Sequence, residues 1–511
     1  MKQLEAEAEK LGITPAMLME NAGKAVAGHV RRFLGGVVGR KIVVLAGPGN
    51  NGGDGEVAAR YLREWGGEVT LYLCAQRQAD DPNLKMALER GVTAIEAEGD
   101  ANQAQLLSYL SSADVVIDAI FGTGQSRAID GVFQKILFRL AEAKNAHPSL
   151  RIVAVDLPSG LRADSGVADQ ATPFADYTIT LGLPKRGLYS PTGARRAGDV
   201  SVADIGIPPQ LTANLPAELV SSGWARSILP QRSPFAHKGS FGRVLVVAGS
   251  LNYTGAAYLA CSGAMRVGVG LVTLASAKSL QPIIASKLSE ATYLPLAESS
   301  TGLVYPDAYK TVLAAAVDYD VVLIGCGLGQ KATTKEFTLK AIFRLKESQK
   351  MVLDADALNH LADVKEWWKR IPFDAILTPH PGEMARLCGL TTEEVQANRF
   401  ELALGKAAEW NKTIILKGAN TVVAAPNGRM RINPSANAGL ASAGTGDVLA
   451  GVIGGLLAQG LNLYDGASLG VYLHSQAGEA VRQRLGEAGM IASDLLLGLP
   501  VTIKSLKEAK H

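Results

Sequence analysis

Cysteine is scarce in this sequence, and the few cysteines show no metal-binding or redox pattern. The chain of 511 residues holds 4 of them, far apart and in neither a CxxC pair nor a Cys/His group: Cys74, Cys261, Cys326 and Cys388. This spacing argues against a structural zinc site and fits a reducing compartment. No apolar run reaches the length of about 18 residues that a membrane-spanning helix needs, and the charged N-terminal stretch is unlike a secretory signal. We therefore expect a cytoplasmic protein without a membrane partner.

A strong excess of charge of one sign is also missing. The formal net charge is +3, and no Lys/Arg cluster is interleaved with aromatic residues, so nothing points to a nucleic-acid partner. Apolar residues make up 47% of the chain and glycines number 55, which is typical of an α/β protein. A chain of this length is expected to form two domains of roughly 200–280 residues each. Because prolines gather before residue 236, we predict a first domain over 1–210, a linker over 211–236 and a second domain over 237–505.

The first half begins with two expected helices within residues 1–35 and then shows a nucleotide-binding arrangement. A strand over 41–45 runs into a glycine-rich segment over 47–55, and a helix follows over about 56–65. The glycines even satisfy GxGxxG, which predicts a dehydrogenase if an acidic residue ends the second strand. That strand, over 68–73, ends in CAQR instead. Ordinary hydride transfer is therefore disfavoured.

Polar side chains follow the next strands of the first half where each strand ends. Asp118 follows a strand over 114–117, and Asp156 and Ser159 follow a strand over 151–155. The carboxyl ends of parallel strands line one crevice, so we expect these side chains to converge with Asn51. An aspartate after a strand is more often a cap when it is taken alone. Together the set indicates a cation site, an acid/base pair, or both.

The segments GPGNNGGDG, DAIFGTG and VDLPSG resemble the YjeF N-terminal family, the NAD(P)H-hydrate epimerases, over most of residues 10–210. The resemblance implies a Rossmann-like three-layer α/β/α fold, K⁺ held by Asn51, Asp118 and Ser159, and Asp156 at the hydrated ring as the catalytic acid/base. It also implies these contacts to the dinucleotide: Asn50, Asn51, Gly52, Gly53, Asp54, Gly122, Thr123, Gly124, Gln125, Ser126, Arg127 and Ala128. The N-terminus is shorter than is usual in that family, which leaves the role of the first helix open.

The second half repeats strands that end in polar residues and closes on a glycine-rich helix start. Gly444-Thr445-Gly446-Asp447 precedes an apolar helix expected over 448–457, so bare backbone N–H groups would form an anion site. Asp447 is then a candidate base for a hydroxyl that attacks a phosphoryl group. Cys326 is disfavoured as a nucleophile because no basic group neighbours it in the sequence. Lys417 fits either a solvated loop or a nucleotide phosphate.

The segments HKGSFG, LDADALN, TPHPGEMARL, LKGANTVVA and NAGLASAGTGDVLAG resemble the YjeF C-terminal family, the ADP- or ATP-dependent NAD(P)H-hydrate dehydratases of ribokinase-like fold, over about 230–500. The resemblance implies that ADP is held by Lys417, Gly418, Ala419, Asn420, Thr421 and Gly446. It places these residues at the hydrated dinucleotide: Ala256, Gly327, His380, Pro381, Gly382, Glu383, Met384, Ala385, Arg386 and Asp447. Cys326 stands where the family usually has proline, which changes loop stiffness more than chemistry.

The two resemblances imply one function, the repair of hydrated nicotinamide coenzymes. The first domain would interconvert the R and S forms of hydrated NADH or NADPH (NADHX, NADPHX), and the second would dehydrate the S form with ADP and Mg²⁺, giving AMP and phosphate. A homo-oligomer, a tetramer or larger, is expected. Two alternatives are a ribokinase-like small-molecule kinase with an accessory domain and a nucleotide-binding scaffold without turnover. The sequence leaves open ADP against ATP, NADHX against NADPHX, and channelling between the domains.

Overall fold

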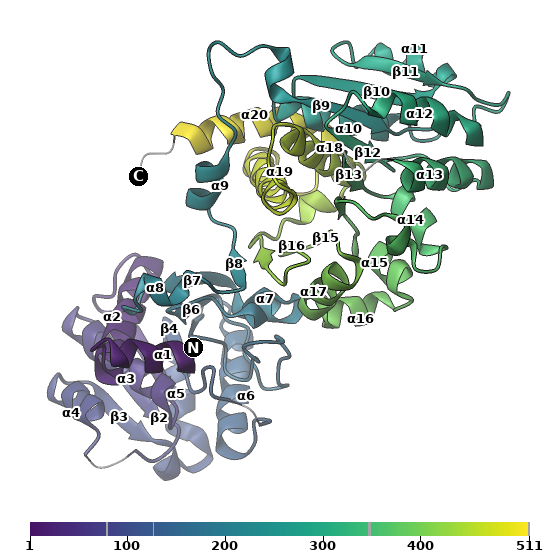
Figure 1. Ribbon diagram of the computed structural model, residues 1–511. Coiled ribbons are helices and arrows are strands. Elements are labelled where there is room, and N and C mark those ends of the chain that lie inside the picture. The colour runs from purple at the N-terminus through teal and green to yellow at the C-terminus, as the bar shows by residue number, and fades with distance from the viewer. Residues whose placement is uncertain (78–79, 126, 346–348, 509–511) are drawn as a thin grey trace. The chain divides into compact units, whose positions relative to one another are not determined.

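The computed structural model describes residues 1–77, 80–125, 127–345 and 349–508, and it divides into two compact units (Figure 1). The first unit is Met1–Leu215 and the second is Pro216–His511. Ser126, one of the expected dinucleotide contacts, lies outside the described residues. In the described ranges no helix combines the length and the apolar character needed to cross a membrane.

The first unit is built on a seven-stranded parallel sheet in the order β3-β2-β1-β4-β5-β6-β7. The strands are β1 Lys41–Ala46, β2 Glu68–Leu73, β3 Thr93–Glu96, β4 Val115–Ala119, β5 Arg151–Val155, β6 Tyr177–Leu181 and β7 Asp199–Ala203. The helices are α1 Lys2–Lys10, α2 Pro15–Phe33, α3 Asn50–Glu64, α4 Pro82–Glu89, α5 Ala104–Ser112, α6 Gly131–Ala146, α7 Pro191–Ala197 and α8 Pro209–Thr212. The strand order changes direction at β1 and β4, which is where a doubly wound sheet opens a crevice.

Helices cover both faces of this sheet because its strands are apolar on both sides. Ile42 and Val44 of β1 belong to a core cluster that includes α2 and α3, whereas Val43 and Leu45 belong to a second cluster with α5 and α6. The result is a three-layer α/β/α unit, as the sequence predicts. The expected break between the first two helices is also confirmed: Thr14 caps α2 by accepting a hydrogen bond from the backbone N–H of Met17 at 3.3 Å.

The glycine-rich segment of the first unit differs from the prediction, because α3 begins at Asn50 and not near residue 56. Its glycines lie inside the first turns of the helix, where they permit close packing. A Cβ at Gly52 would lie 2.0 Å from the carbonyl oxygen of Gly47, and one at Gly55 would lie 2.7 Å from the Cβ of Ala119. These glycines thus bring the helix against the sheet, and the first turn of α3 carries the side chains of the expected site.

The second unit contains a ten-stranded sheet in the order β11-β10-β9-β12-β13-β14-β15-β16-β17-β8. From β11 to β15 in this order all neighbouring strands are parallel. Strand β16 is antiparallel to both its neighbours, and β17 and β8 are parallel to each other. The strands are β8 Ala217–Leu219, β9 Arg243–Val247, β10 Leu271–Ala277, β11 Thr292–Leu296, β12 Val321–Ile324, β13 Lys350–Leu353, β14 Ala375–Leu377, β15 Thr413–Leu416, β16 Val422–Ala424 and β17 Met430–Ile432.

Helix α18 is the central helix of the second unit and packs between α10 and α19 (Figure 1). A Cβ at Gly451 of α18 would lie 1.9 Å from the carbonyl oxygen of Ala260, so only glycine permits this contact with α10. The helices are α9 Ser222–Ile228, α10 Thr254–Arg266, α11 Gln281–Ala285, α12 Tyr309–Ala316, α13 Ala332–Arg344, α14 Asp356–Ala362, α15 Pro381–Cys388, α16 Thr392–Ala397, α17 Arg399–Trp410, α18 Thr445–Ala458, α19 Leu463–Leu485 and α20 Ala492–Glu508.

The segment expected to be a linker, 211–236, is largely part of the second unit. Strand β8 pairs with β17, and Val220, Ala225 and Leu229 are buried in the core cluster around α18 and α19. The prolines that mark this segment in the sequence therefore flank short structured elements. The division after Leu215 places the start of the second unit about twenty residues before the expected position, residue 237.

Candidate active sites

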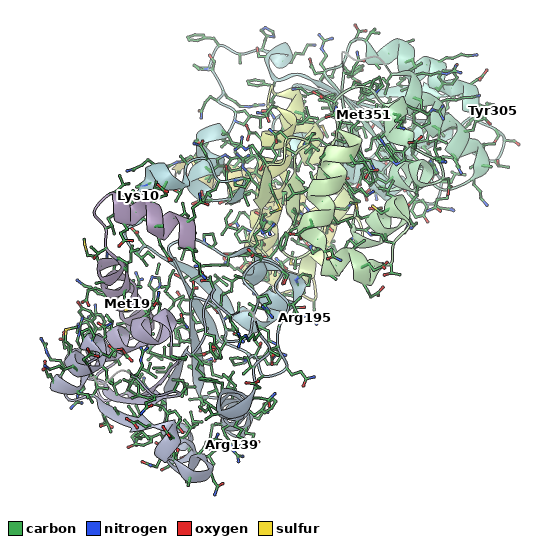
Figure 2. The ribbon with its side chains drawn as sticks, turned by 60° about the horizontal axis from the view of Figure 1, so that its bottom comes forward. Lys10, Met19, Arg139, Arg195, Tyr305 and Met351 are labelled. Carbon is green, nitrogen blue, oxygen red and sulfur yellow. The ribbon has the colours of Figure 1, made fainter. Side chains whose placement is uncertain are left out.

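A cavity of about 860 Å³ opens in the first unit beside the carboxyl ends of β1, β4, β5 and β6. Of the residues expected to contact a dinucleotide or to act at its ring, these line it: Asn50, Asn51, Asp54, Gly122, Thr123, Gly124, Gln125, Arg127, Ala128 and Asp156. Gly52 and Gly53 are buried within α3 and do not line it. Residues of α1 also border the cavity, among them Lys2 and Glu5, and Met19, labelled in Figure 2, lies on the part of α2 that borders it.

The sequence left the role of α1 open, and in the structure this helix borders the cavity. Helices α1 and α2 form part of the wall of the cavity, through Ala6 of α1 and Leu18 of α2 among others. The short N-terminus still supplies this wall. The sequence offers no motif that marks α1 as a site element, since its residues are ordinary helix formers.

Asp118 and Ser159 form a fully buried pair beside the cavity. The Ser159 hydroxyl donates to Asp118 Oδ1 at 2.6 Å, and the Ser159 backbone N–H donates to Oδ2 at 2.8 Å. Burial raises the pKa of Asp118, while the hydrogen bonds from Ser159 oppose that rise. No basic side chain of the described residues forms an ion pair with Asp118. The Nδ2 of Asn51 is buried and has no hydrogen-bond partner in the described part of the chain.

Asp156 is held in a strained conformation at the end of β5. Its φ of 65° lies in the left-handed region, which a residue other than glycine rarely adopts. Its Oδ1 accepts hydrogen bonds from Lys185 Nζ at 2.5 Å, the backbone N–H of Leu181 at 3.1 Å and the Thr180 hydroxyl at 3.3 Å. Lys185 also lines the cavity. Sequence reasoning missed this lysine, although it follows the end of β6 at the same edge of the sheet.

Asp54 lies near Asp156 in the same cavity and is almost completely buried. Burial, and then the negative charge of Asp156, raise the pKa of Asp54 well above its ordinary value, and Lys185 opposes this only in part. A Cβ built on Gly122 would lie 3.0 Å from Asn51 Oδ1 and 3.2 Å from Asp156 Oδ2. The cavity therefore brings together an amide, a paired carboxylate and a buried carboxyl group with a raised pKa.

In the second unit, the ends of β13, β14 and β15 bring charged side chains together. Asp354 Oδ1 accepts hydrogen bonds from Lys417 Nζ at 2.9 Å and from the Thr378 hydroxyl at 2.5 Å. Burial works against the charge of Lys417, but the nearby carboxylates of Asp354 and Glu383 raise its pKa. Lys417 is thus a paired lysine of the site and not a solvated loop residue. Asp354 and Thr378 were not predicted as site residues.

Asp447 lies in the same cluster, in the first turn of α18. Ligand atoms of Cys326, Asp354 and Asp447 all lie within 4.8 Å of one another. Burial, and then the charge of Asp354, raise the pKa of Asp447 to about 6. Burial also raises the pKa of Cys326 well above its ordinary value, so the thiol stays protonated and is unsuited to act as a nucleophile.

The N-terminus of α18 presents backbone N–H groups next to these side chains. Gly444, with φ of 89°, is the N-cap, and the helix begins at Thr445. The N–H of Thr445 donates to Ser442 O at 3.4 Å, whereas the N–H groups of Ala443, Gly444 and Gly446 donate no hydrogen bond within the described part of the chain. Lys417 Nζ is 3.4 Å from the Cβ position of Gly446. An anion at this turn would therefore meet both helix amides and a lysine.

Buried His474 of α19 fixes the start of α18. Its Nε2 lies 2.9 Å from the carbonyl oxygen of Thr445, and burial lowers its pKa to about 4. The neutral imidazole therefore donates its Nε2 proton to that carbonyl. Sequence reasoning missed His474, which stands within an otherwise apolar helical stretch.

His380 and Glu383 start α15 with reciprocal capping bonds. His380 Nδ1 accepts from the backbone N–H groups of Gly382 and Glu383, and Glu383 Oε2 accepts from the N–H of His380 at 2.8 Å. Nδ1 is therefore unprotonated, and His380 Nε2, 3.3 Å from Glu383 Oε1, carries the proton. Burial raises the pKa of Glu383, and Lys417 lies 3.9 Å from its Oε2.

The remaining expected contacts of the second unit divide into accessible and buried positions. Pro381 and Arg386 are accessible, and Arg386 bonds to Asn359, whereas Met384 is fully buried and Ala385 nearly so. A Cβ at Gly327 would lie 2.6 Å from the Cβ of Ala256, so those two positions are adjacent. The loop after β15 holds Gly418 and Ala419, both exposed, then Asn420 and Thr421, whose hydroxyl donates to Gly418 O at 2.7 Å.

Comparison with known proteins identifies the family. Residues 244–500 match the family described as NAD(P)H-hydrate dehydratase, and residues 15–187 match the family described as YjeF-related protein N-terminus. A bifunctional NAD(P)H-hydrate repair enzyme of Moorella thermoacetica is 41% identical over 517 residues, which cover 99% of this chain and 96% of that protein. The chain belongs to this family. The bifunctional NAD(P)H-hydrate repair enzyme of Escherichia coli is 34% identical, with 96% of this chain and 89% of that protein covered.

A solved structure supports the fold of the second unit. A ribokinase-like superfamily protein from Enterococcus faecalis matches 57% of this chain and 97% of its own, at 24% identity and a TM-score of 0.51. At that identity the likeness concerns the fold alone. The ribokinase-like fold expected for the second unit is therefore confirmed, and the two-domain family membership agrees with the order of motifs in the sequence.

Proposed function

We propose that this chain repairs hydrated NAD(P)H by two reactions, one in each unit. The first unit interconverts the R and S forms, and the second dehydrates the S form with ADP, yielding NAD(P)H, AMP and phosphate. Membership of the bifunctional repair family supports the pair of activities. The observation that carries the dehydratase half is Asp447, which lies in the first turn of α18 beside unbonded backbone amides, with Lys417 Nζ 3.4 Å from the Cβ position of Gly446.

The dehydratase site solves the problem of a poor leaving group. Hydroxide leaves the reduced ring with difficulty, whereas phosphate leaves easily. Asp447 takes the hydroxyl proton as the oxygen attacks the terminal phosphoryl group of ADP, and the amide of Gly446 and the ammonium of Lys417 stabilise the charge on that group. The ring nitrogen then expels phosphate, and loss of a proton from the adjacent ring carbon restores the double bond.

Magnesium is expected on the phosphates of ADP and not in a protein cage. The carboxylate that clusters with Asp447 is Asp354, which already pairs with Lys417 and Thr378, and the third donor of the cluster is the thiol of Cys326. Magnesium prefers oxygen ligands and often keeps phosphates and water in its shell. This donor set therefore does not fit a magnesium site made of protein atoms alone.

A potassium ion fits the buried pair in the first unit. Asp118 is fully buried and lacks a cationic partner among the described residues, and oxygen atoms of Ser159 and Asn51 are available around the same edge of the sheet. A monovalent cation there would offset the buried negative charge. These three residues would hold the ion and thereby fix the loops that carry Asp156 and Gly122.

The proposed function is tested by following absorbance of NADH formed from a mixture of both hydrate epimers. With ADP and Mg²⁺ we expect complete conversion, because epimerisation supplies the S form. With a dehydratase alone, conversion would halt at the S fraction except for slow spontaneous epimerisation. A phosphorylated product that accumulates without any return of NADH absorbance would instead identify a small-molecule kinase and overturn the proposal.

A further inference from the structure

The two oxygens of the Asp156 carboxylate have different surroundings. All three hydrogen bonds to this side chain, from Lys185, Leu181 and Thr180, end on Oδ1. In the described part of the chain no hydrogen bond reaches Oδ2, which lies 3.2 Å from the position that a Cβ on Gly122 would occupy. One oxygen is anchored, and the other lies beside Gly122, which lines the cavity together with Asp156.

Lys185 is the strongest of the three anchors. Its Nζ lies 2.5 Å from Asp156 Oδ1 and 2.6 Å from the carbonyl oxygen of Leu181, and its side chain is only 6% exposed. Both acceptors stand at adjacent strand ends, so the lysine links the loop after β5 to the end of β6. A charged hydrogen bond in a buried setting is roughly twice as strong as a neutral one.

The backbone at Asp156 needs such an anchor. With φ of 65°, it occupies a conformation that is strained for a residue other than glycine. Strain of this kind persists only when surrounding contacts determine the conformation. The contacts to Oδ1 meet that need, and they turn the carboxylate so that Oδ2 is free.

We propose that Lys185 is the positioning residue of the epimerase site, holding one oxygen of Asp156 so that the other exchanges a proton with the hydrated ring. This inference rests on the proposed function. Oδ2 takes the proton of the ring hydroxyl, the carbon–nitrogen bond beside that hydroxyl breaks, and an aldehyde forms. The ring nitrogen keeps the electron pair of the broken bond and receives the same proton from Oδ2. Closure on the opposite face of the carbon reverses each step and yields the other epimer, with no net gain or loss of atoms.

Lys144 provides a matched control. It is a partly buried lysine of the same unit, and its Nζ donates to both oxygens of Asp176 at 2.9 Å and to Leu150 O at 2.6 Å. It does not line the cavity. Its loss removes an ion pair and a carbonyl contact much as the loss of Lys185 does, but away from the site.

The test uses the full chain and hydrated NADH enriched in the R form, with conversion to the S form measured by chromatography and corrected for the spontaneous rate. For Lys185→Met we expect kcat about 100-fold lower with KM changed less than about threefold, since general acid–base groups contribute roughly 10²–10⁴. Lys185→Arg keeps the charge, so its kcat should be about tenfold higher than that of Lys185→Met. For Lys144→Met we expect kcat within about threefold of the unsubstituted chain.

Three results would overturn the inference: Lys185→Met keeping kcat within about threefold, a loss that lies wholly in KM, or an equal loss in Lys144→Met. Thermal unfolding of the first unit is measured on every variant to show that it has folded, and dehydration of the S form with ADP shows that the second unit is unaffected. If Lys185→Met does not fold, Lys185→Gln takes its place, because it also removes the charge: a kcat within about threefold of that of the unsubstituted chain sinks the inference. An unsubstituted chain that fails to interconvert the epimers would overturn the proposed epimerase itself.

Discussion

Replacing Asp447 by Asn should abolish dehydration while making the second unit more stable. Burial and the charge of Asp354 raise the pKa of Asp447 from 3.8 to about 6. The native state therefore binds this proton more tightly than the unfolded chain does, so stability falls as pH rises from about 4 to about 6. At about 1.4 kcal/mol per pKa unit, the ionised side chain costs the native state up to about 3 kcal/mol above pH 6.

The same shift predicts the pH dependence of the reaction. A base with a pKa near 6 is about 90% ionised at pH 7 and about 10% ionised at pH 5, so kcat/KM should fall about tenfold between these values. An aspartate with an ordinary pKa would leave the rate nearly flat over that range. Asp354→Asn removes the negative neighbour that raises the pKa of Asp447, so the decrease in kcat/KM should occur at lower pH.

The assay pairs dehydration kinetics with thermal unfolding of the Asp447→Asn chain at pH 8 and pH 5. We expect at least about a 100-fold loss of kcat. We also expect the unfolding transition of the second unit to rise by roughly 5 °C at pH 8, and by about half as much at pH 5. Turnover within about tenfold of the unsubstituted chain would refute Asp447 as the base. A variant less stable than the parent at pH 8 would refute the claim that its charge is held at a cost.

Three further outcomes follow from the two sites. Gly122→Ala should slow epimerisation roughly tenfold or more and leave dehydration unchanged, because its Cβ would lie 3.0 Å from Asn51 Oδ1. An epimerisation rate equal to that of the unsubstituted chain would contradict this. A thiol reagent should label only Cys388 in the native chain and spare dehydration, since Cys326 and the other two cysteines are buried; rapid inactivation would count against it. Replacing potassium by a bulky organic cation should lower the epimerase rate and the unfolding temperature of the first unit, with the dehydratase as the internal control; an unchanged rate would remove the argument for the ion.

Much of the fold could be predicted from sequence because the strands are short apolar runs with glycine or polar residues at their ends. The strands expected over 41–45, 68–73, 114–117 and 151–155 are found within one or two residues of those bounds, as β1, β2, β4 and β5. The predicted start of the helix after the first strand was wrong because the glycine-rich segment was assigned to a loop. Gly52 and Gly55 lie within α3, because contact with the sheet outweighs the poor helix propensity of glycine.

The sites were predictable only for residues that stand in motifs. Asp156 and Asp447 were found because each follows a strand or opens a glycine-rich helix. Lys185 and Asp354 were missed as site residues because their importance lies in their partners, which come from other strands. A single lysine after a strand has no distinctive local pattern.

The sequence by itself determined the alternation of strands and helices, which depends on local apolar periodicity, and the order of the two domains, which follows from the motifs that resemble the two families. Only the tertiary structure decided which charges meet. It paired Lys185 with one oxygen of Asp156, placed Lys417 between Asp354 and the start of α18, and buried Asp447 enough to raise its pKa to about 6. Charge pairing and burial depend on distances between strand ends far apart in the chain, and those distances exist only once the sheets have formed.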